Sequence, residues 1–318
     1  MMDITTIGEI LIDLTQTSIN QDNIGSFAAN PGGAPANVAV AAAKLGAHTA
    51  FLGKIGRDNF GNGLRQVLMD NGVDISGLRT DEKPTTMAVV SVAPDGERSF
   101  SFVRGADCQL SPDEIDERQL EQTKFLHFGS VSLTAGPSRS ATIFAARHAH
   151  ACGTLVSYDP NYRAALWRTV EDAQQWMTIP LPLVDIIKLS EEELFLITGT
   201  DNLERGSRFL EEKGISLVLV TLGSKGSFFR WRGQTGLIPG IKVPVADTNG
   251  AGDTFLGAVL SRLASRGEHP LEGLTAAHLE EILTFANRAA AWTCKGSGAI
   301  PAMPTLEQLK KTAPACSA

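Results

Sequence analysis

The sequence lacks the excess of basic residues that marks nucleic-acid-binding proteins and the long apolar segments that mark membrane-spanning proteins. Its 318 residues include 28 basic and 35 acidic side chains, for a net charge of −7, whereas a nucleic-acid-binding protein needs a basic surface. Apolar runs stay short of the roughly 18 residues that a membrane-spanning helix requires. The first residues, MMDITTIGEILIDL, are acidic where a signal peptide would be basic. We therefore expect a cytoplasmic protein with no nucleic-acid partner and no membrane partner.

Cysteine, aromatic residues and several catalytic motifs are also scarce or missing. Cys108, Cys152, Cys294 and Cys316 lie far apart, which excludes a CxxC motif or a metal knuckle and fits a reducing compartment. There is no P-loop, no GxGxxG after the N-terminal strand, no GxSxG and no HExxH. These absences disfavour a P-loop NTPase, a nicotinamide enzyme, a serine hydrolase of the α/β class and a zinc protease.

What the sequence does contain is an alternation of short apolar runs with amphipathic stretches. The runs are rich in β-branched and aromatic residues and predict strands at Ile4–Ile10, Thr49–Ile55, Phe125–Phe128, Thr154–Tyr158, Asp185–Leu189 and Leu217–Thr221. The stretches between them predict helices at Pro35–Leu45, Phe60–Asn71, Pro137–Ala151, Glu191–Thr198, Leu203–Glu212, Gly252–Ser265 and Leu279–Thr293. This order predicts an α/β fold with a doubly wound, mostly parallel sheet flanked by helices. The unbroken apolar stretch Leu217–Val220 predicts a strand that is buried on both faces.

Two segments interrupt that alternation. Thr15–Asn30 is polar and has no helical period, and Thr85–Arg104 contains MAVVSV and RSFSFV on either side of APDGE, whose Asp-Gly pair predicts a hairpin turn. We expect a small β-sheet lid, formed by residues 14–31 and 85–105 and inserted in one domain that spans residues 1–318. A small exposed sheet leaves edges to cover, so we also expect a homodimer through the lid.

The first of two glycine-rich loops runs from Asn30 to Asn37. Gly32 and Gly33 allow a close backbone approach to a ligand, and Pro35 suits the first turn of a helix. Asn37 would lie in that turn, where its amide could bind sugar hydroxyls. Taken alone, the loop favours a plain turn before an alanine-rich core helix over a ligand site.

The second loop, Asp247–Phe255, opens a helix whose apolar stripe follows it. The N–H groups at Gly250–Gly252 and the positive end of the helix dipole form a site for an anion. A carboxylate at Asp253 would repel a phosphate, but it suits a general base that takes a proton from an attacking hydroxyl. The structural alternative is a helix-stabilising charge worth about 0.3–1 kcal/mol.

Together these loops resemble the ribokinase-like (PfkB) carbohydrate kinases, most closely the fructokinase branch. The resemblance rests on PGGAPANVAVAAAKLGAHTAFLGKIGRDNFG at 31–61 and DTNGAGDTFLGAVL at 247–260, with HFGSVSL, SYDPNYR, KLSEEE and TLGSKGS between them in the family's order. It covers nearly the whole chain. It implies a large α/β domain with a small sheet over the sugar site, and transfer of the γ-phosphoryl group of ATP to a primary hydroxyl with Mg²⁺. It leaves a requirement for K⁺ open.

The resemblance also implies roles for individual residues. Asp253 corresponds to the catalytic base, and Gly250, Ala251 and Gly252 to the anion hole. The implied sugar contacts are Asp13, Gly32, Gly33, Asn37, Arg104, Asn161 and Arg163. The implied ATP contacts are Ser190, Thr221, Gly223, Lys225, Gly226 and Asn287. Glu193 matches a glutamate tied to magnesium through water, and Asp247 matches a ligand of a monovalent cation. Ser190 departs from the asparagine that many relatives have.

The substrate that the resemblance favours is fructose, giving fructose 6-phosphate. 2-Keto-3-deoxygluconate, ribose and aminoimidazole riboside remain alternatives within the family, and Arg104 and Arg163 could supply cations for the carboxylate of the first. A different class also stays open, namely a sensor that binds sugar or nucleotide without catalysis. An intact GAGD loop counts against a sensor, since binding alone needs no base at Asp253.

Overall fold

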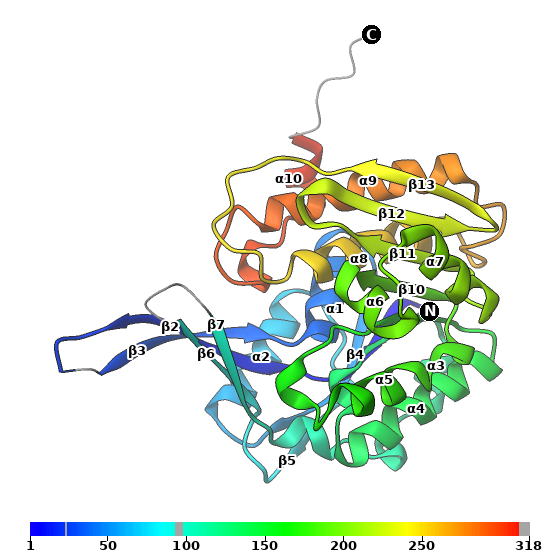
Figure 1. The fold of residues 1–318 in the computed structure, drawn as a ribbon. Helices are drawn as coiled ribbons and strands as arrows, with labels where there is room; N and C mark the ends of the chain where they lie inside the picture. The colour runs from blue at the N-terminus through cyan, green and yellow to red at the C-terminus, as the bar shows by residue number, and fades with distance from the viewer. Residues whose placement is uncertain (23, 93–97, 312–318) are drawn as a thin grey trace.

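The structure is a computed structural model that describes residues 1–22, 24–92 and 98–311. The predicted Asp-Gly turn within residues 93–97 and Cys316 lie outside these residues. The described chain forms a large layered body from which a small sheet projects (Figure 1). Within the described ranges, no helix combines the length and the apolar character needed to cross a membrane.

The large sheet has nine strands in the order β13-β12-β11-β10-β9-β8-β1-β4-β5. Their bounds are β1 Met2–Ile7, β4 Thr49–Gly56, β5 Leu78–Asp81, β8 Thr123–Gly129, β9 Leu155–Asp159, β10 Ile186–Ser190, β11 Leu217–Thr221, β12 Gly226–Trp231 and β13 Gln234–Pro239. All neighbours from β11 to β5 are parallel, and β12 and β13 pair antiparallel at one edge. The predicted doubly wound, mostly parallel sheet is therefore confirmed.

Helices cover both faces of this sheet (Figure 1). One face packs against α1 Ala34–Lys44, α8 Ala251–Ala264, α9 Ala276–Thr293 and α10 Leu306–Lys311. The other face packs against α4 Gly136–Ala151, α5 Val170–Thr178, α6 Glu191–Thr198 and α7 Leu203–Glu212, with the short α3 Glu117–Glu121 at its margin. Side chains of β11 alternate between the two cores, with Leu217 and Leu219 in the first and Val218 and Val220 in the second. All four are fully buried, as the apolar run predicts.

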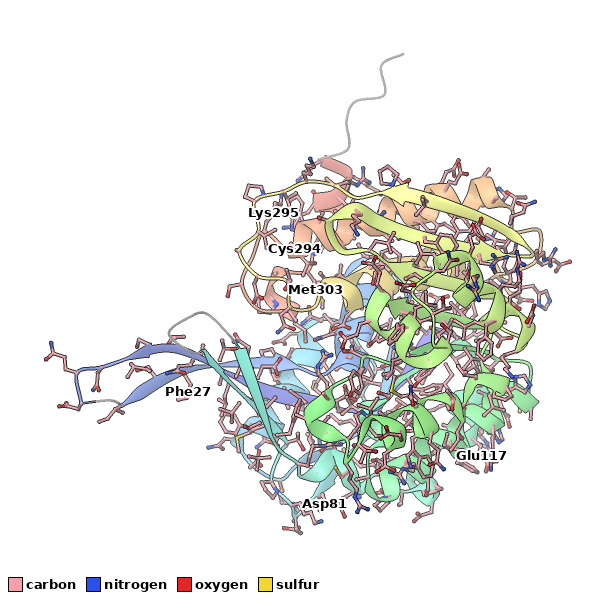
Figure 2. All side chains as sticks on the ribbon, viewed as in Figure 1. Phe27, Asp81, Glu117, Cys294, Lys295 and Met303 are labelled. Atoms are coloured by element: carbon pink, nitrogen blue, oxygen red, sulfur yellow. The ribbon has the colours of Figure 1, made fainter. Side chains whose placement is uncertain are left out.

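A third core lies where α1 and α2 (Asn59–Asp70) meet β4 and the base of the small sheet. The small sheet has the order β3-β2-β6-β7, with bounds β2 Leu11–Ile19, β3 Gly25–Gly32, β6 Met87–Val92 and β7 Arg98–Val103. The two segments that interrupt the α/β alternation thus pair with each other, β2 running parallel to β6. Phe27 on this sheet is 45% exposed and lies away from the large body (Figure 2). The predicted lid function and dimer remain predictions.

Some strands of the large sheet differ from the sequence-based prediction. The predicted strand Ile4–Ile10 ends at Ile7, because Gly8, at φ 149°, turns the chain out of the large sheet toward β2. The hairpin of β12 and β13 was not predicted, and its turn at Arg232 and Gly233 has positive φ at both residues. That geometry matches the right-handed twist of two-residue hairpins.

Candidate active site

A cleft of about 620 Å³ lies between the small sheet and the carboxyl ends of the parallel strands. Doubly wound sheets bind ligands at this edge, where the loops after neighbouring strands diverge. Both glycine-rich loops and the segment after β9 contribute to its walls. The predicted site residues that line it are Asp13, Gly33, Asn37, Asn161, Arg163, Asp247, Gly250, Gly252 and Asp253.

Asp253 lies in the first turn of α8 at the floor of the cleft and is only 7% exposed. Asn37 Nδ2 donates a 2.8 Å hydrogen bond to one carboxylate oxygen, Oδ2. Asn161 Nδ2 donates a 3.3 Å hydrogen bond to the other, Oδ1. Segments from three distant parts of the chain therefore fix the orientation of one carboxylate.

The surroundings of Asp253 also set its proton affinity. Burial, reinforced by the negative charge of Asp159, raises the pKa of Asp253 to about 6. The hydrogen bond from Asn37 and the charges of Lys188 and Arg163 act in the opposite direction. At neutral pH the carboxylate is ionised, yet it is more basic than an exposed aspartate. A pKa close to the working pH is the condition under which a general base is most effective.

The N-terminus of α8 forms one wall of the cleft. Gly250 caps the helix in the left-handed conformation, with φ 76°, which a residue with a side chain rarely adopts. Gly250 and Gly252 line the cleft, whereas Ala251 does not, and its N–H donates to the Thr248 carbonyl at 3.3 Å. Of the three residues predicted to form an anion hole, two therefore face the cleft. The first turn of a helix has N–H groups without intrahelical acceptors, which suit an anion.

Asp13, on β2, lines the cleft from the small sheet. Asn249 Nδ2 lies 3.5 Å from Asp13 Oδ2 and joins this carboxylate to the loop before α8. Burial raises the pKa of Asp13, against the effects of Asn249 and of the positive charge of Arg163. Gly32 does not line the cleft itself, but a Cβ at this position would overlap Asp13 Oδ2. The first glycine-rich loop has a glycine at this position because Asp13 occupies the space that a side chain would need.

Gly33 and Glu9 together fix the start of α1. Gly33 caps the helix at φ 108°, and Glu9 Oε1 accepts the Ala34 N–H at 3.0 Å. Glu9 is 2% exposed, and its second oxygen, Oε2, has no hydrogen-bond partner. Burial, with a contribution from the charge of Asp107, raises the pKa of Glu9 to about 7. Glu9 lines the cleft and was missed from the sequence, where an acidic residue inside the apolar run ITTIGEILI was the available signal.

The two predicted arginines lie in different surroundings. Arg163 lines the cleft, is exposed, and donates to the Tyr162 carbonyl at 3.1 Å. Arg104 is not part of the lining, since its guanidinium donates to Asp107 Oδ2 and to Thr134 Oγ1. The structure therefore brings Arg163, but not Arg104, to the cleft.

The residues predicted to bind ATP lie beyond this cleft. Ser190 ends β10 and caps α6, Thr221 ends β11, and Gly223, Lys225 and Gly226 form the turn into β12. Asn287 on α9 donates to the carbonyls of Ile238 and Pro239, each at 3.3 Å. All but Asn287 lie at or just after the carboxyl ends of β10 and β11. Their contacts with a nucleotide remain predictions.

The two predicted metal-site carboxylates both hold backbone in place. Glu193 accepts the N–H groups of Tyr162 and Ser190, each at 2.7 Å, one on each oxygen. Asp247 accepts the N–H of Asn249 at 3.0 Å and that of Gly298 at 3.1 Å. Among the described residues, one group outside the cleft also has metal-binding chemistry: Glu121, His148 and Cys152 each place a donor atom within 4.8 Å of the others.

An ion pair that was not predicted from the sequence lies beneath the cleft. Lys188 Nζ, on β10, lies 2.7 Å from Asp159 Oδ2, at the end of β9. Lys188 lines the cleft and is 6% exposed, and Asp159 is 1% exposed. The lysine interrupts the apolar run of DIIKLS, which was the signal available in the sequence.

Known proteins are similar to this chain in both sequence and fold. The sequence matches the pfkB family carbohydrate kinase over residues 1–306. It is similar to fructokinase-1 of Oryza sativa subsp. japonica, with 40% identity over 314 residues, 97% of this chain and 96% of the relative. A fructokinase from Xylella fastidiosa, solved with bound ATP, superimposes with a TM-score of 0.90 at 32% identity over 97% of each chain. A fructokinase variant from Vibrio cholerae, solved with fructose, ADP and potassium, has a TM-score of 0.87 at 34% identity over 98% of each chain.

Proposed function

The chain belongs to the pfkB family of carbohydrate kinases and is an ATP-dependent carbohydrate kinase, and on that premise we propose that its substrate is fructose and its product fructose 6-phosphate. The observation that carries the proposal is the buried carboxylate of Asp253, oriented by Asn37 and Asn161 at the start of α8. The cleft beside it accommodates a monosaccharide. The similarity to fructokinases, one of them solved with fructose, supports the choice of sugar.

In the proposed reaction, the primary hydroxyl of the sugar lies against Asp253. The carboxylate takes the hydroxyl proton as the oxygen attacks the γ-phosphorus of ATP. The new oxygen–phosphorus bond forms as the bond between the γ-phosphorus and the bridging oxygen breaks, and ADP leaves with that oxygen. Gly250 and Gly252 line the cleft, and in this proposal their amide groups donate to the phosphoryl oxygens, which carry the growing charge.

Asp13 is the residue of the small sheet that we propose to bind sugar hydroxyls. A carboxylate has two oxygens and can accept hydrogen bonds from neighbouring hydroxyls. Its position on the small sheet means that sugar binding places one wall of the cleft against the substrate. A closed cleft excludes water, which would otherwise compete with the sugar for the phosphoryl group.

Glu193 and Asp247 are the two carboxylates that we propose to take part in metal binding. Magnesium supplies charge neutralisation for the phosphates of ATP when it is bound. Both oxygens of Glu193 accept backbone N–H groups, so its carboxylate suits a contact through water rather than direct ligation. Asp247 lies in a loop with backbone carbonyls, and such oxygens suit a monovalent cation, so we propose it as the residue beside which potassium would bind.

A coupled assay of ADP release with MgATP tests the substrate. We would measure fructose, ribose, 2-keto-3-deoxygluconate and aminoimidazole riboside, each with and without potassium. Turnover selective for fructose supports the proposal, and mass spectrometry of the product places the phosphate. Preference for the keto acid would implicate Arg163, an exposed basic residue that lines the cleft. ATP or sugar binding without any sugar-dependent ADP would favour the sensor instead.

A further inference from the structure

The cleft contains a buried positive charge whose position calls for an explanation. Two basic side chains line it among the described residues, Arg163, which is exposed, and Lys188, which is 6% exposed. Lys188 projects from β10 toward α8, on the strand face opposite Ile187 and Leu189, which lie in the other core. The ammonium group is thus held inside the site rather than at its rim.

Lys188 lies directly against the loop proposed to receive the phosphoryl group. A Cβ built on Gly252 would lie 3.0 Å from Lys188 Nζ. The ammonium is therefore next to the backbone of the first turn of α8. Asp159 Oδ2 accepts a hydrogen bond from it at 2.7 Å and holds it in that place.

The charges around Lys188 keep it protonated. Burial alone would lower its pKa, but the charges of Asp159, Glu193 and Asp253, together with the hydrogen bond to Asp159, raise the pKa above its usual value. A buried ion pair adds little net stability, because removing two charges from water costs about as much as their attraction returns. Stability therefore gives no sufficient reason for placing this pair beneath the cleft.

We infer that Lys188 is a further catalytic residue of this kinase, a fixed cation that stabilises the negative charge of the phosphoryl group as it passes over Gly252. The inference rests on the proposed sugar kinase function. Phosphoryl transfer depends almost entirely on positioning and on electrostatic stabilisation of charge on the transferring group. Asp159 then acts as a positioning residue, since it holds the ammonium while leaving the other ammonium protons to face the phosphoryl oxygens.

The test compares variants that separate charge from packing. Lys188→Met removes the charge but could leave Asp159 unpaired and the protein unstable. The double variant Lys188→Met with Asp159→Asn removes both charges and keeps the buried site neutral. Asp159→Asn alone retains the lysine charge. Lys54→Met is the matched control, because Lys54 is also a buried strand lysine, paired with Glu114 at 2.8 Å, and does not line the cleft.

We expect kcat of the double variant to fall at least about 100-fold below that of Asp159→Asn, while KM for fructose changes less than threefold. Affinity for ADP with aluminium fluoride, which imitates the planar phosphoryl group, should fall by a similar factor in the presence of fructose, and affinity for ADP alone should not. Lys54→Met should lower the melting temperature and leave kcat within threefold of wild type.

A folded double variant with kcat within threefold of Asp159→Asn would overturn the inference and make the ion pair structural. Wild-type protein is assayed in parallel. If it forms ADP with fructose and the double variant does so equally well, only the role of Lys188 fails. If wild type forms no ADP with any sugar, the proposed function fails and the inference falls with it.

Discussion

Asn37 donates a 2.8 Å hydrogen bond to Asp253 across a separation of 216 positions in the sequence. The bond joins the first turn of α1 to the first turn of α8, so the two glycine-rich loops meet at one carboxylate. From the sequence, Asn37 is predicted to contact the sugar and Asp253 to act as the catalytic base. The structure adds that Asn37 orients the Asp253 carboxylate.

Replacing Asp253 with asparagine should abolish most of the activity without unfolding the protein. We expect kcat to fall at least about 100-fold, because asparagine cannot accept the hydroxyl proton. The melting temperature at pH 7 should be equal or higher, since a buried carboxylate with a raised pKa destabilises the fold when it ionises. Steady-state kinetics and differential scanning calorimetry measure the two effects. A variant that retained more than a tenth of the rate would show that Asp253 is not the base.

The pH dependence of kcat/KM should report the ionisation of Asp253. Because the base must be unprotonated, activity should fall tenfold per pH unit below about pH 6, the raised pKa of this carboxyl. Asn37→Ala removes a hydrogen bond that lowers this pKa, so its acid limb should move to higher pH. Rate profiles of both proteins from pH 5 to 9 provide the measurement. An unshifted acid limb in the variant would separate Asn37 from the ionisation of the base.

A methyl group at Gly32 should weaken sugar binding selectively. The Cβ of Gly32→Ala would overlap Asp13 Oδ2 and displace that carboxylate. We expect KM for fructose to rise about tenfold or more and KM for ATP to change little. Gly63→Ala is the control, because this exposed position in α2 has open space around a Cβ. Gly63→Ala should retain full activity and gain about 0.5–1 kcal/mol of stability. If Gly32→Ala and Gly63→Ala had the same KM for fructose, Asp13 would not be part of the sugar site.

Glu9 should make the stability of the protein depend on pH. The unfolded chain releases this proton near pH 4.5, whereas the folded protein keeps it to about pH 7. Between these values the folded state binds more protons, so the contribution of Glu9 to stability falls as the pH rises. Glu9→Gln does not ionise and keeps an acceptor for Ala34. The melting temperature of Glu9→Gln minus that of wild type should be larger at pH 8 than at pH 5. An equal difference at the two pH values would argue against a raised pKa of Glu9.

The exposed apolar side chains of the small sheet should mediate dimer formation. Ile19 on β2, Phe27 on β3 and Ile24 just before β3 are all more than a third exposed, and a small sheet with such residues has surface to cover. Light scattering should give twice the 33.8 kDa chain mass for wild type and the chain mass itself for Phe27→Asp. Leu237→Asp is the control, an exposed apolar residue on β13 of the large body. A monomeric wild type would refute the predicted dimer.

Most of the large body could be predicted because its elements have local signals. The helices Glu191–Thr198 and Leu203–Glu212 and the strand Leu217–Thr221 have the bounds expected from their periodicity and caps. The β12–β13 hairpin lacked such a signal, since its turn uses Arg232 where glycine or asparagine is usual. The strand expected at Ile4–Ile10 was too long, because Gly8 turns the chain out of the large sheet and Ile10 enters a different core from Ile4.

The candidate site was predictable to the extent that its residues fall within contiguous motifs. Asp253 and Asn37 each stand next to glycines that mark a helix start, so each loop could be recognised separately. Lys188 and Asp159 could not be recognised in this way. They belong to different strands, and only the parallel pairing of β9 with β10 brings them together. Partners that meet across a sheet leave no spacing pattern in the sequence.

Three residues, Gly8 to Ile10, lead from β1 of the large sheet to β2 of the small one. The middle residue, Glu9, also bonds the first amide of α1, so the connection between the sheets and the start of that helix share one fixed point. Asp13 lies shortly after Glu9, in β2, and Asn37 lies shortly after Ala34, in the first turn of α1. The small sheet and the helix that carries Asn37 are for this reason anchored to the same residue. On the proposed function, a sugar that displaces Asp13 is therefore expected to disturb Asn37 and the Asp253 carboxylate that it orients, so a poorly fitting sugar should lower kcat as well as raise KM.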